Sequence, residues 1–274
     1  MGYTLHCYTT STTSASADRP TATAVLPRGY VLTGGGATDN YGNGAGNMLT
    51  ASYPVQSAGS STYNGWCVAG KDHLQTDPAT ITAYAIGIRI EDENGQSLPI
   101  PQSVQQVTGA SADHPSATAY VANGFTGVGG GASDNYGSGT GNMLTGSFPV
   151  YEGGTITAWT ATGKDQIDSD PATVTAYAIG IQLPAGVNFD LDINRAVSAP
   201  AEHPSVTASA PDGNTVLGGG AVDIYTGTGN ILTQSAPGPI VNNAAMSWAV
   251  AGKDHVQADP SGTVTSWVIS MELT

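Results

Sequence analysis

The chain has 274 residues, of which only 10% are charged, and its 21 acidic and 7 basic residues give a formal net charge of -14 at pH 7. A surface this acidic repels polyphosphates, which argues against nucleic acid as a partner, and no stretch approaches the roughly 18 apolar residues of a membrane helix, which argues against membrane insertion. The 37 glycines, together with abundant Ala, Ser, Thr and β-branched residues, favour strands and turns over helices and predict an all-β protein.

The sequence contains three similar segments in tandem. A Gly-Gly-Gly-Ala run begins at Gly34, Gly129 and Gly218, a tryptophan recurs at Trp66, Trp159 and Trp248, and an aspartate recurs at Asp77, Asp170 and Asp259. The spacing of these landmarks changes by only a few residues from one interval to the next, as expected from short loop insertions. We therefore expect three homologous units, 1–92, 93–184 and 185–274, of about six strands each.

Each unit is predicted to open with a strand, which begins near Tyr3, Leu98 or Val187. An X-Pro pair follows, and because proline keeps the preceding residue out of the helical region, Pro20, Pro115 and Pro204 mark the entry to a second strand rich in Thr and Ala.

The glycine run is predicted to form the third strand, in which neighbouring backbones approach closely. A Gly-rich loop around Asp and Tyr follows, since glycine adopts positive φ at little cost. The fourth strand ends at Pro54, Pro149 or Pro237, because proline cannot donate to a ladder.

The tryptophan strand comes fifth and ends in Gly-Lys-Asp, and the tryptophans themselves are expected in the core. In the sixth strand, "TVTAYAIGI", both alternating faces are apolar or small, so this strand should be central and covered on both sides.

Two ways of packing the units are open: three separate β-sandwiches, or one β-prism-like body with pseudo-threefold symmetry. The joints between units contain no long Gly/Ser tract, and each continues into a predicted strand. This favours the single body.

The repeated polar and aromatic residues are the candidate ligand-binding residues. A tyrosine in a loop can offer its face to a sugar, while carboxylates, amides and lysines bond to hydroxyl groups. The loop candidates are Asp39, Tyr41, Asn47, Asp134, Tyr136, Asn142, Asp223, Tyr225 and Asn230, and those after the tryptophan strand are Lys71, Asp72, His73, Lys164, Asp165, Lys253, Asp254 and His255.

Each candidate group also has a structural interpretation. The Asp and Asn side chains can form Asx-turns, and the Lys-Asp pair can close a turn through a salt bridge and hydrogen bonds to the backbone. His73 and His255 could bind a metal or act as bases, but the equivalent residue is Gln166, which can do neither in the same way.

The sequence gives little support for calcium binding, phosphate binding or catalysis. A calcium site needs 6 to 8 oxygen ligands, and each loop holds one Asp with one or two Asn. The glycine run is not followed by Lys-Ser/Thr or a helix start, so it is no phosphate-binding loop. No nucleophile, base and acid set stands out, and we expect no enzyme activity, no cofactor and no metal.

The pattern "GGGA", "LTxSxP", Trp and "VTAYA" resembles a repeat of extracellular bacterial proteins. By architecture the chain is similar to triplicated β-prism and β-trefoil lectins, although it has none of their diagnostic motifs. The resemblance implies a bacterial, secreted protein, at the cell surface or outside, while the first twenty residues show no export signal and leave a cytoplasmic location open.

The function predicted from sequence is a non-enzymatic, lectin-like protein with up to three related sites for glycans or glycoconjugates, since repetition adds avidity. The alternative is a structural, adhesive or toxin-associated module without a small ligand. A homo-oligomer is compatible with either. A disulfide between Cys7 and Cys67 is geometrically possible, but two buried or incidental thiols are favoured, because the other units lack them.

Overall fold

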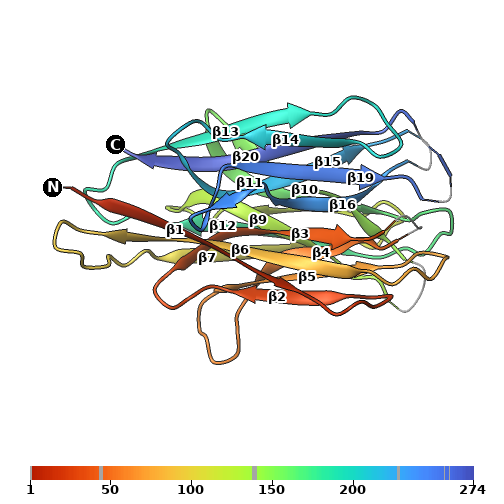
Figure 1. Ribbon diagram of the computed structural model, residues 1–274, viewed down its shortest axis with the longest axis horizontal. Coiled ribbons are helices and arrows are strands. Elements are labelled where there is room, and N and C mark those ends of the chain that lie inside the picture. The colour runs from red at the N-terminus through yellow and green to blue at the C-terminus, as the bar shows by residue number, and fades with distance from the viewer. Residues whose placement is uncertain (1, 43–45, 138–140, 227–228, 256, 259) are drawn as a thin grey trace.

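The computed structural model describes residues 2–42, 46–137, 141–226, 229–255, 257–258 and 260–274, so the landmark Asp259 lies outside the described residues. Within this part the chain forms twenty β-strands and no helix, which confirms the all-β prediction. The strands run roughly along the longest dimension of the molecule, and both termini lie at the same end (Figure 1). None of the described residues belongs to a helix of the length and apolarity that a membrane crossing requires.

In segment 1–92 the strands are β1 (Thr4–Thr13), β2 (Thr21–Val25), β3 (Val31–Asn40), β4 (Met48–Val55), β5 (Gly65–Lys71) and β6 (Thr80–Glu91). In segment 93–184 they are β7 (Gln102–Thr108), β8 (Ser116–Tyr120), β9 (Thr126–Asp134), β10 (Met143–Glu152), β11 (Thr155–Lys164) and β12 (Val174–Ile181). The prediction that the fourth strand ends at Pro149 is wrong, because β10 continues beyond this proline to Glu152 and stays paired with β11.

In segment 185–274 they are β13 (Phe189–Val197), β14 (Ser205–Ser209), β15 (Thr215–Ile224), β16 (Ile231–Pro237), β17 (Ile240–Val241), β18 (Ala244–Ala245), β19 (Ser247–Lys253) and β20 (Thr263–Leu273). The additional hairpin β17–β18 turns through Asn242 and Asn243, which adopt positive φ of 52° and 65°. Asparagine tolerates this conformation in two-residue hairpin loops.

Strands of different segments pair within the two large sheets, and all strand pairs among the described residues are antiparallel. The six-stranded sheet has the order β1-β6-β3-β16-β19-β14. The twelve-stranded sheet consists of β13-β20-β15-β10-β11-β8 and β7-β12-β9-β4-β5-β2, joined by the single pair Ile156–Gly127. The same order thus recurs three times, and the segments meet at the β3–β16, β9–β4 and β15–β10 pairs.

The consecutive glycines allow this close pairing. A β-carbon on Gly130 would overlap the indole of Trp159, and one on Gly131 would lie 2.5 Å from the carbonyl oxygen of Ser52, in the neighbouring segment. At Gly34 it would lie 2.6 Å from the carbonyl oxygen of Leu217, also in another segment. The predicted close approach of backbones at the glycine run is confirmed.

The core is continuous across the segments. One hydrophobic cluster contains side chains from all three, including the tryptophans, which are almost fully buried. The indole nitrogens donate to the hydroxyls of Ser52, Ser147 and Ser235 at 2.9–3.0 Å, so burial leaves these donors satisfied. Met48, Met143 and Ile231, which open β4, β10 and β16, form a small second cluster. The predicted core position of the tryptophans is confirmed.

The sixth strand of each segment is central, as predicted: β12 lies between β7 and β9 and is buried along almost its whole length. Both cysteines are free thiols. The pKa of Cys7 is raised to about 11, chiefly by burial.

Candidate functional site

The lysines that end β5, β11 and β19 are only 1% exposed. Each ammonium group lies over a tyrosine ring of a different segment, at Nζ-to-centroid distances of 4.2 Å for Lys71–Tyr136, 4.0 Å for Lys164–Tyr225 and 4.2 Å for Lys253–Tyr41. A desolvated cation–π contact of this kind stabilises by up to about 2 kcal/mol. Each of these lysine–tyrosine contacts therefore holds two segments together.

These contacts define three lysine clusters. The first contains Lys253, Asp39, Tyr41, Asn47 and Asp72, the second Lys71, Asp134, Tyr136, Asn142 and Asp165, and the third Lys164, Asp223, Tyr225, Asn230 and Asp254. In every cluster the lysine comes from one segment and the other four residues come from another.

The aspartate that follows each lysine accepts hydrogen bonds from residues of its own segment. Asn47 donates through Nδ2 to Asp72 at 2.5 Å, Asn142 donates to Asp165, and Asn230 donates to Asp254 at 2.9 Å. The second oxygen of Asp72 accepts from the backbone of Asp77 at 2.7 Å, which closes the turn before β6.

The predicted turn-closing salt bridge between Lys71 and Asp72 is wrong. Adjacent residues of an extended chain point to opposite sides, so Lys71 enters the second cluster while Asp72 stays in the first.

Burial shifts the titration of the lysine clusters toward neutral pH. It raises the pKa of Asp134 to about 7, against the opposing charge of Lys71, and lowers the pKa of Lys71 to about 8. Burial likewise raises the pKa of Asp39 to about 7 and lowers that of Lys253. Neither the two carboxylate oxygens of Asp134 nor the Nζ of Lys71 makes a hydrogen bond within the described part of the chain.

Most of the predicted ligand-binding residues lie inside the protein. The buried ones are Asp39, Asn47, Lys71, His73, Asp134, Asn142, Lys164, Asp223, Asn230, Lys253 and His255, whereas Tyr41, Asp72, Tyr136, Asp165, Tyr225 and Asp254 are half-buried. Because a lysine covers one face of each tyrosine, that face is closed to a sugar ring. The repeated residues thus hold loops and segments together.

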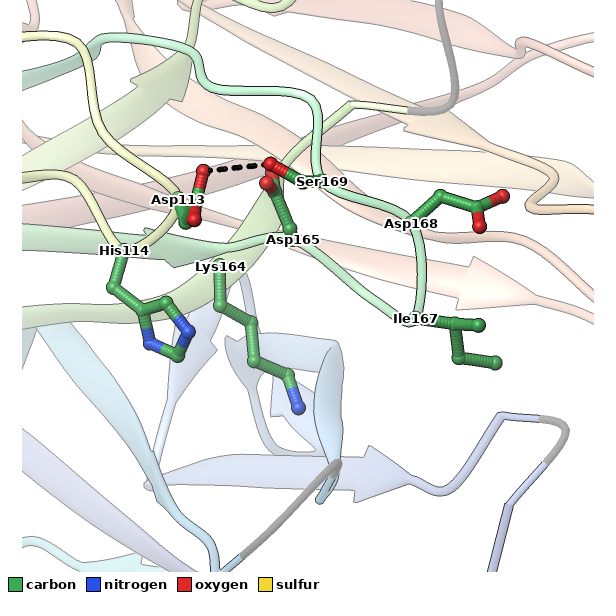
Figure 2. A pocket seen from close by; sticks show the side chains of 7 residues that line it. All are labelled: Asp113, His114, Lys164, Asp165, Ile167, Asp168 and Ser169. Carbon is green, nitrogen blue, oxygen red and sulfur yellow. Dashed lines mark hydrogen bonds between the residues drawn. The ribbon is translucent and has the colours of Figure 1, made fainter.

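A small polar hollow of about 250 Å³ lies beside the third lysine cluster (Figure 2). Its lining residues are Asp113, His114, Lys164, Asp165, Ile167, Asp168 and Ser169. Ser169 donates to Asp113 at 3.0 Å, and the Lys164 side chain extends away from this pair to donate to the carbonyl of Gly229 at 3.1 Å. Five of the lining side chains are therefore already engaged in hydrogen bonds: those of Asp113, His114, Lys164, Asp165 and Ser169.

His73, Gln166 and His255 meet in one place, which we call the histidine cluster. The two imidazole rings lie 4.9 Å apart between centroids, and Gln166 donates through Nε2 to the backbone carbonyl of His255 at 3.1 Å. The sequence interpretation, which assigned His73 and His255 to separate sites, is corrected: the two residues meet, together with Gln166, in a single cluster.

An aromatic pocket of about 320 Å³ lies between segments 1–92 and 93–184. We call it the tyrosine pocket. It is lined by Tyr53, Pro54, Val55, Gln56, Tyr63, Gln106 and Tyr177. The rings of Tyr53 and Tyr177 are stacked, with centroids 5.2 Å apart and planes inclined by 20°.

Sequence reasoning missed this pocket. Tyr177 was visible in the sixth-strand pattern and Tyr53 before the fourth-strand proline, but only the pairing of β4 with β9 brings the two strands of different segments together. A search for tyrosines at strand positions outside the repeated loops would have found the residues, though not their contact.

A comparison with protein-family models found no match, and a comparison with curated proteins also found none. In the described part of the chain, no group of three or more His, Cys, Asp or Glu side chains is arranged to hold a metal ion.

Proposed function

We propose that the chain is a non-enzymatic glycan-binding protein in which three homologous segments form one rigid body with pseudo-threefold symmetry, and that the tyrosine pocket is its sugar site. The repeated loop residues stabilise the body, and the glycan contacts come from Tyr53, Tyr63, Tyr177 and the adjacent amides. This places the site on a sheet surface shared by two segments.

The single-body part of the proposal is supported by the shared sheets. Both large sheets combine strands of more than one segment, and each lysine cluster draws its cation from a different segment than its carboxylates. If the segments formed three separate sandwiches, each lysine would lack the tyrosine that it contacts in the neighbouring segment. A body held in this way supplies a rigid surface on which a binding site can sit.

The sugar site is supported chiefly by the stacked pair Tyr53–Tyr177. Ligand pockets are lined by aromatic side chains with a few polar groups, and their volumes begin at about 300 Å³. The apolar face of a sugar can pack on a tyrosine ring, whose π face attracts weakly positive C–H groups. Gln56 and Gln106, both exposed at the edge, supply amide donors and acceptors for the hydroxyls.

Saturation-transfer NMR with monosaccharides, followed by a glycan array, tests the site. We expect Tyr177→Ala to weaken binding of the best glycan at least about tenfold, since it removes one ring of the stacked pair. Tyr84→Ala is the matched control. Tyr84 occupies in segment 1–92 the position of Tyr177, since it pairs with Gly36 as Tyr177 pairs with Gly131. The residue of the neighbouring segment at this position is Ala236, so Tyr84 has no stacked tyrosine beside it.

Equal loss of binding in both variants, or no binding of any sugar at millimolar concentration by the unaltered chain, contradicts the proposed sugar site.

A second candidate function is a structural or adhesive module without a small ligand. It is favoured by the burial of the repeated polar residues, which in a dedicated triple-site lectin would face solvent. Adhesion of beads coated with the whole chain to cell surfaces, unchanged by Tyr177→Ala and by competing sugars, would support this module over the glycan-binding protein.

A further inference from the structure

The histidine cluster is formed by three unusually tight turns. The amide of Gln75 donates to the carbonyl of His73 at 2.7 Å, that of Asp168 to Gln166 at 2.8 Å, and that of Gln257 to His255 at 2.8 Å. Hydrogen bonds between residues two apart close γ-turns, and the form with positive φ at the central residue is rare and strained.

The central residues of two of these turns confirm the strain. Leu74 and Ile167 adopt φ of 59° and 69°, although a β-branched residue such as Ile seldom takes positive φ. Both side chains are exposed, at 50% and 43%, so no burial of their own explains the conformation. The turns instead direct the preceding residues, His73 and Gln166, into the interior. Strain of this kind is typical of functional sites.

Polar atoms that converge in the cluster lack partners. His73 and His255 are 1% and 2% exposed and Gln166 is 1% exposed. Within the described part of the chain, the Nε2 of His255 and the Oε1 of Gln166 make no hydrogen bond, and the His73 ring has only the backbone of Gln166 as a partner. Buried polar atoms are normally satisfied, and a bound ion is one species that can satisfy those that are not.

The separation of the two rings fits shared coordination. A ligand nitrogen lies about 2.0–2.1 Å from a metal and about 1.1 Å from the centre of its own ring, so each ring centre lies about 3.2 Å from the ion. Two ring centres 4.9 Å apart then subtend roughly 100° at the ion, close to the angle of about 109° in a tetrahedral site.

We propose that His73, His255 and Gln166 bind one divalent transition-metal ion per chain, through two imidazole nitrogens and the amide oxygen. The remaining position is open to water. A site built from two imidazoles without thiolate suits copper(II), nickel(II) and zinc(II), and the general order of affinities places copper first.

Hydrogen bonds to the backbone orient the side chains of the histidine cluster. His255 is oriented by the backbone of His73, and Gln166 by the backbone of His255. Metal-binding histidines commonly use their second nitrogen in this way.

The test uses the full chain without a histidine tag. Isothermal titration with Cu²⁺, Ni²⁺ and Zn²⁺ at pH 7 should give one equivalent per chain, and the electron paramagnetic resonance spectrum of the Cu²⁺ form should show two coupled imidazole nitrogens. His73→Gln and His255→Gln, which introduce the residue found at Gln166, should each weaken Cu²⁺ binding at least about tenfold. The exposed His203→Gln is the control and should leave binding unchanged.

Gln166→His provides a gain of function that does not depend on a destabilised variant. A third imidazole should tighten Cu²⁺ binding by about tenfold or more, with three coupled nitrogens in the spectrum. Near-ultraviolet circular dichroism checks that each variant is folded. The proposal is overturned by a stoichiometry of zero, by Cu²⁺ signals that persist in His73→Gln, or by a Gln166→His variant that binds no more tightly than the unaltered chain.

Discussion

The lysine clusters and the histidine cluster arise from the same repeated stretch, Gly-Lys-Asp-His/Gln, yet they differ in number and in composition. Three successive side chains leave the strand end in different directions: Lys71 enters a neighbouring segment, Asp72 closes its own turn, and His73 meets its counterparts. The lysines, which point toward a neighbouring segment, form three similar clusters. His73, Gln166 and His255 meet in one place and form a single cluster of mixed composition. The number of repeats therefore does not fix the number of sites.

The two regions also respond to pH in opposite ways. The pKa of His73 is lowered in the folded protein, whereas the pKa of Asp134 is raised. Stability gained from neutral His73 is present above its unfolded pKa of about 6.5 and is lost as the pH falls toward 4. Stability gained from protonated Asp134 is present below its unfolded pKa of about 3.9 and is lost as the pH rises through 7.

The largest effect is expected from Asn142→Ala in the second lysine cluster. The buried amide donates to Asp165 and to the carbonyl of Asp170, so its removal leaves a cavity and an unsatisfied carboxylate, at a cost of about 2–4 kcal/mol in the free energy of unfolding. Urea denaturation measures this, with the exposed Asn123→Ala as control. A loss below about 0.5 kcal/mol would show that the cluster does not stabilise the fold.

His73→Gln should remove part of the acid sensitivity that comes from the histidine cluster. Between pH 6.5 and 4 the unaltered protein loses up to about 3 kcal/mol through this group, because the unfolded chain binds a proton that the buried ring does not. The melting temperature of the variant relative to the unaltered chain should rise steadily as the pH falls. A difference that is constant with pH would rule out a titrating His73.

Asp134→Asn should show the opposite slope. The variant imitates the protonated acid, so its stability relative to the unaltered chain should increase by about 3 kcal/mol between pH 4 and pH 7. Melting curves across this range, recorded beside those of His73→Gln, give the comparison directly. Parallel slopes in the two variants would mean that the two regions are not electrostatically distinct.

Tyr136→Leu tests the contact between segments in the second lysine cluster. Loss of the ring beneath Lys71 should cost about 1 kcal/mol more than Tyr136→Phe, which keeps the π face. Thermal unfolding of the two variants measures the difference. Equal stability would indicate that the ring contributes only through packing.

The smallest effect is expected from Tyr225→Phe, which removes the hydrogen bond between the tyrosine hydroxyl and Nδ1 of His114 at 3.1 Å. Because both groups are near the surface, the cost should be about 0.5 kcal/mol or less. Chemical denaturation would measure it, and a loss above about 1.5 kcal/mol would place this bond among the main contacts of the third cluster.

Local chemistry was sufficient to predict the strands and the core. Proline positions, alternation in the sixth strand and the recurring tryptophan depend on the chain nearby, and the structure confirms the all-β fold, the buried tryptophans and the closely packed glycines. These features follow from sterics and burial, which act through near neighbours.

The contacts between segments could not be predicted in this way. Nothing in the sequence near Lys71 indicates that its partner is Tyr136, and nothing near Tyr53 indicates Tyr177, because strand partners distant in the chain are chosen by the whole fold. The assumption that each repeated residue serves its own unit therefore misplaced the lysines and assigned His73 and His255 to separate sites.

The exchange of strands between segments bears on how the protein is made. Strands β1, β6 and β3 emerge early from the ribosome, but their sheet continues into β16, β19 and β14, near the end of the chain. Until β16 has been synthesised, the edge of β3 has no partner strand and must be kept from pairing with other polypeptides. The sheet begun first during translation is completed only when β19 has been synthesised.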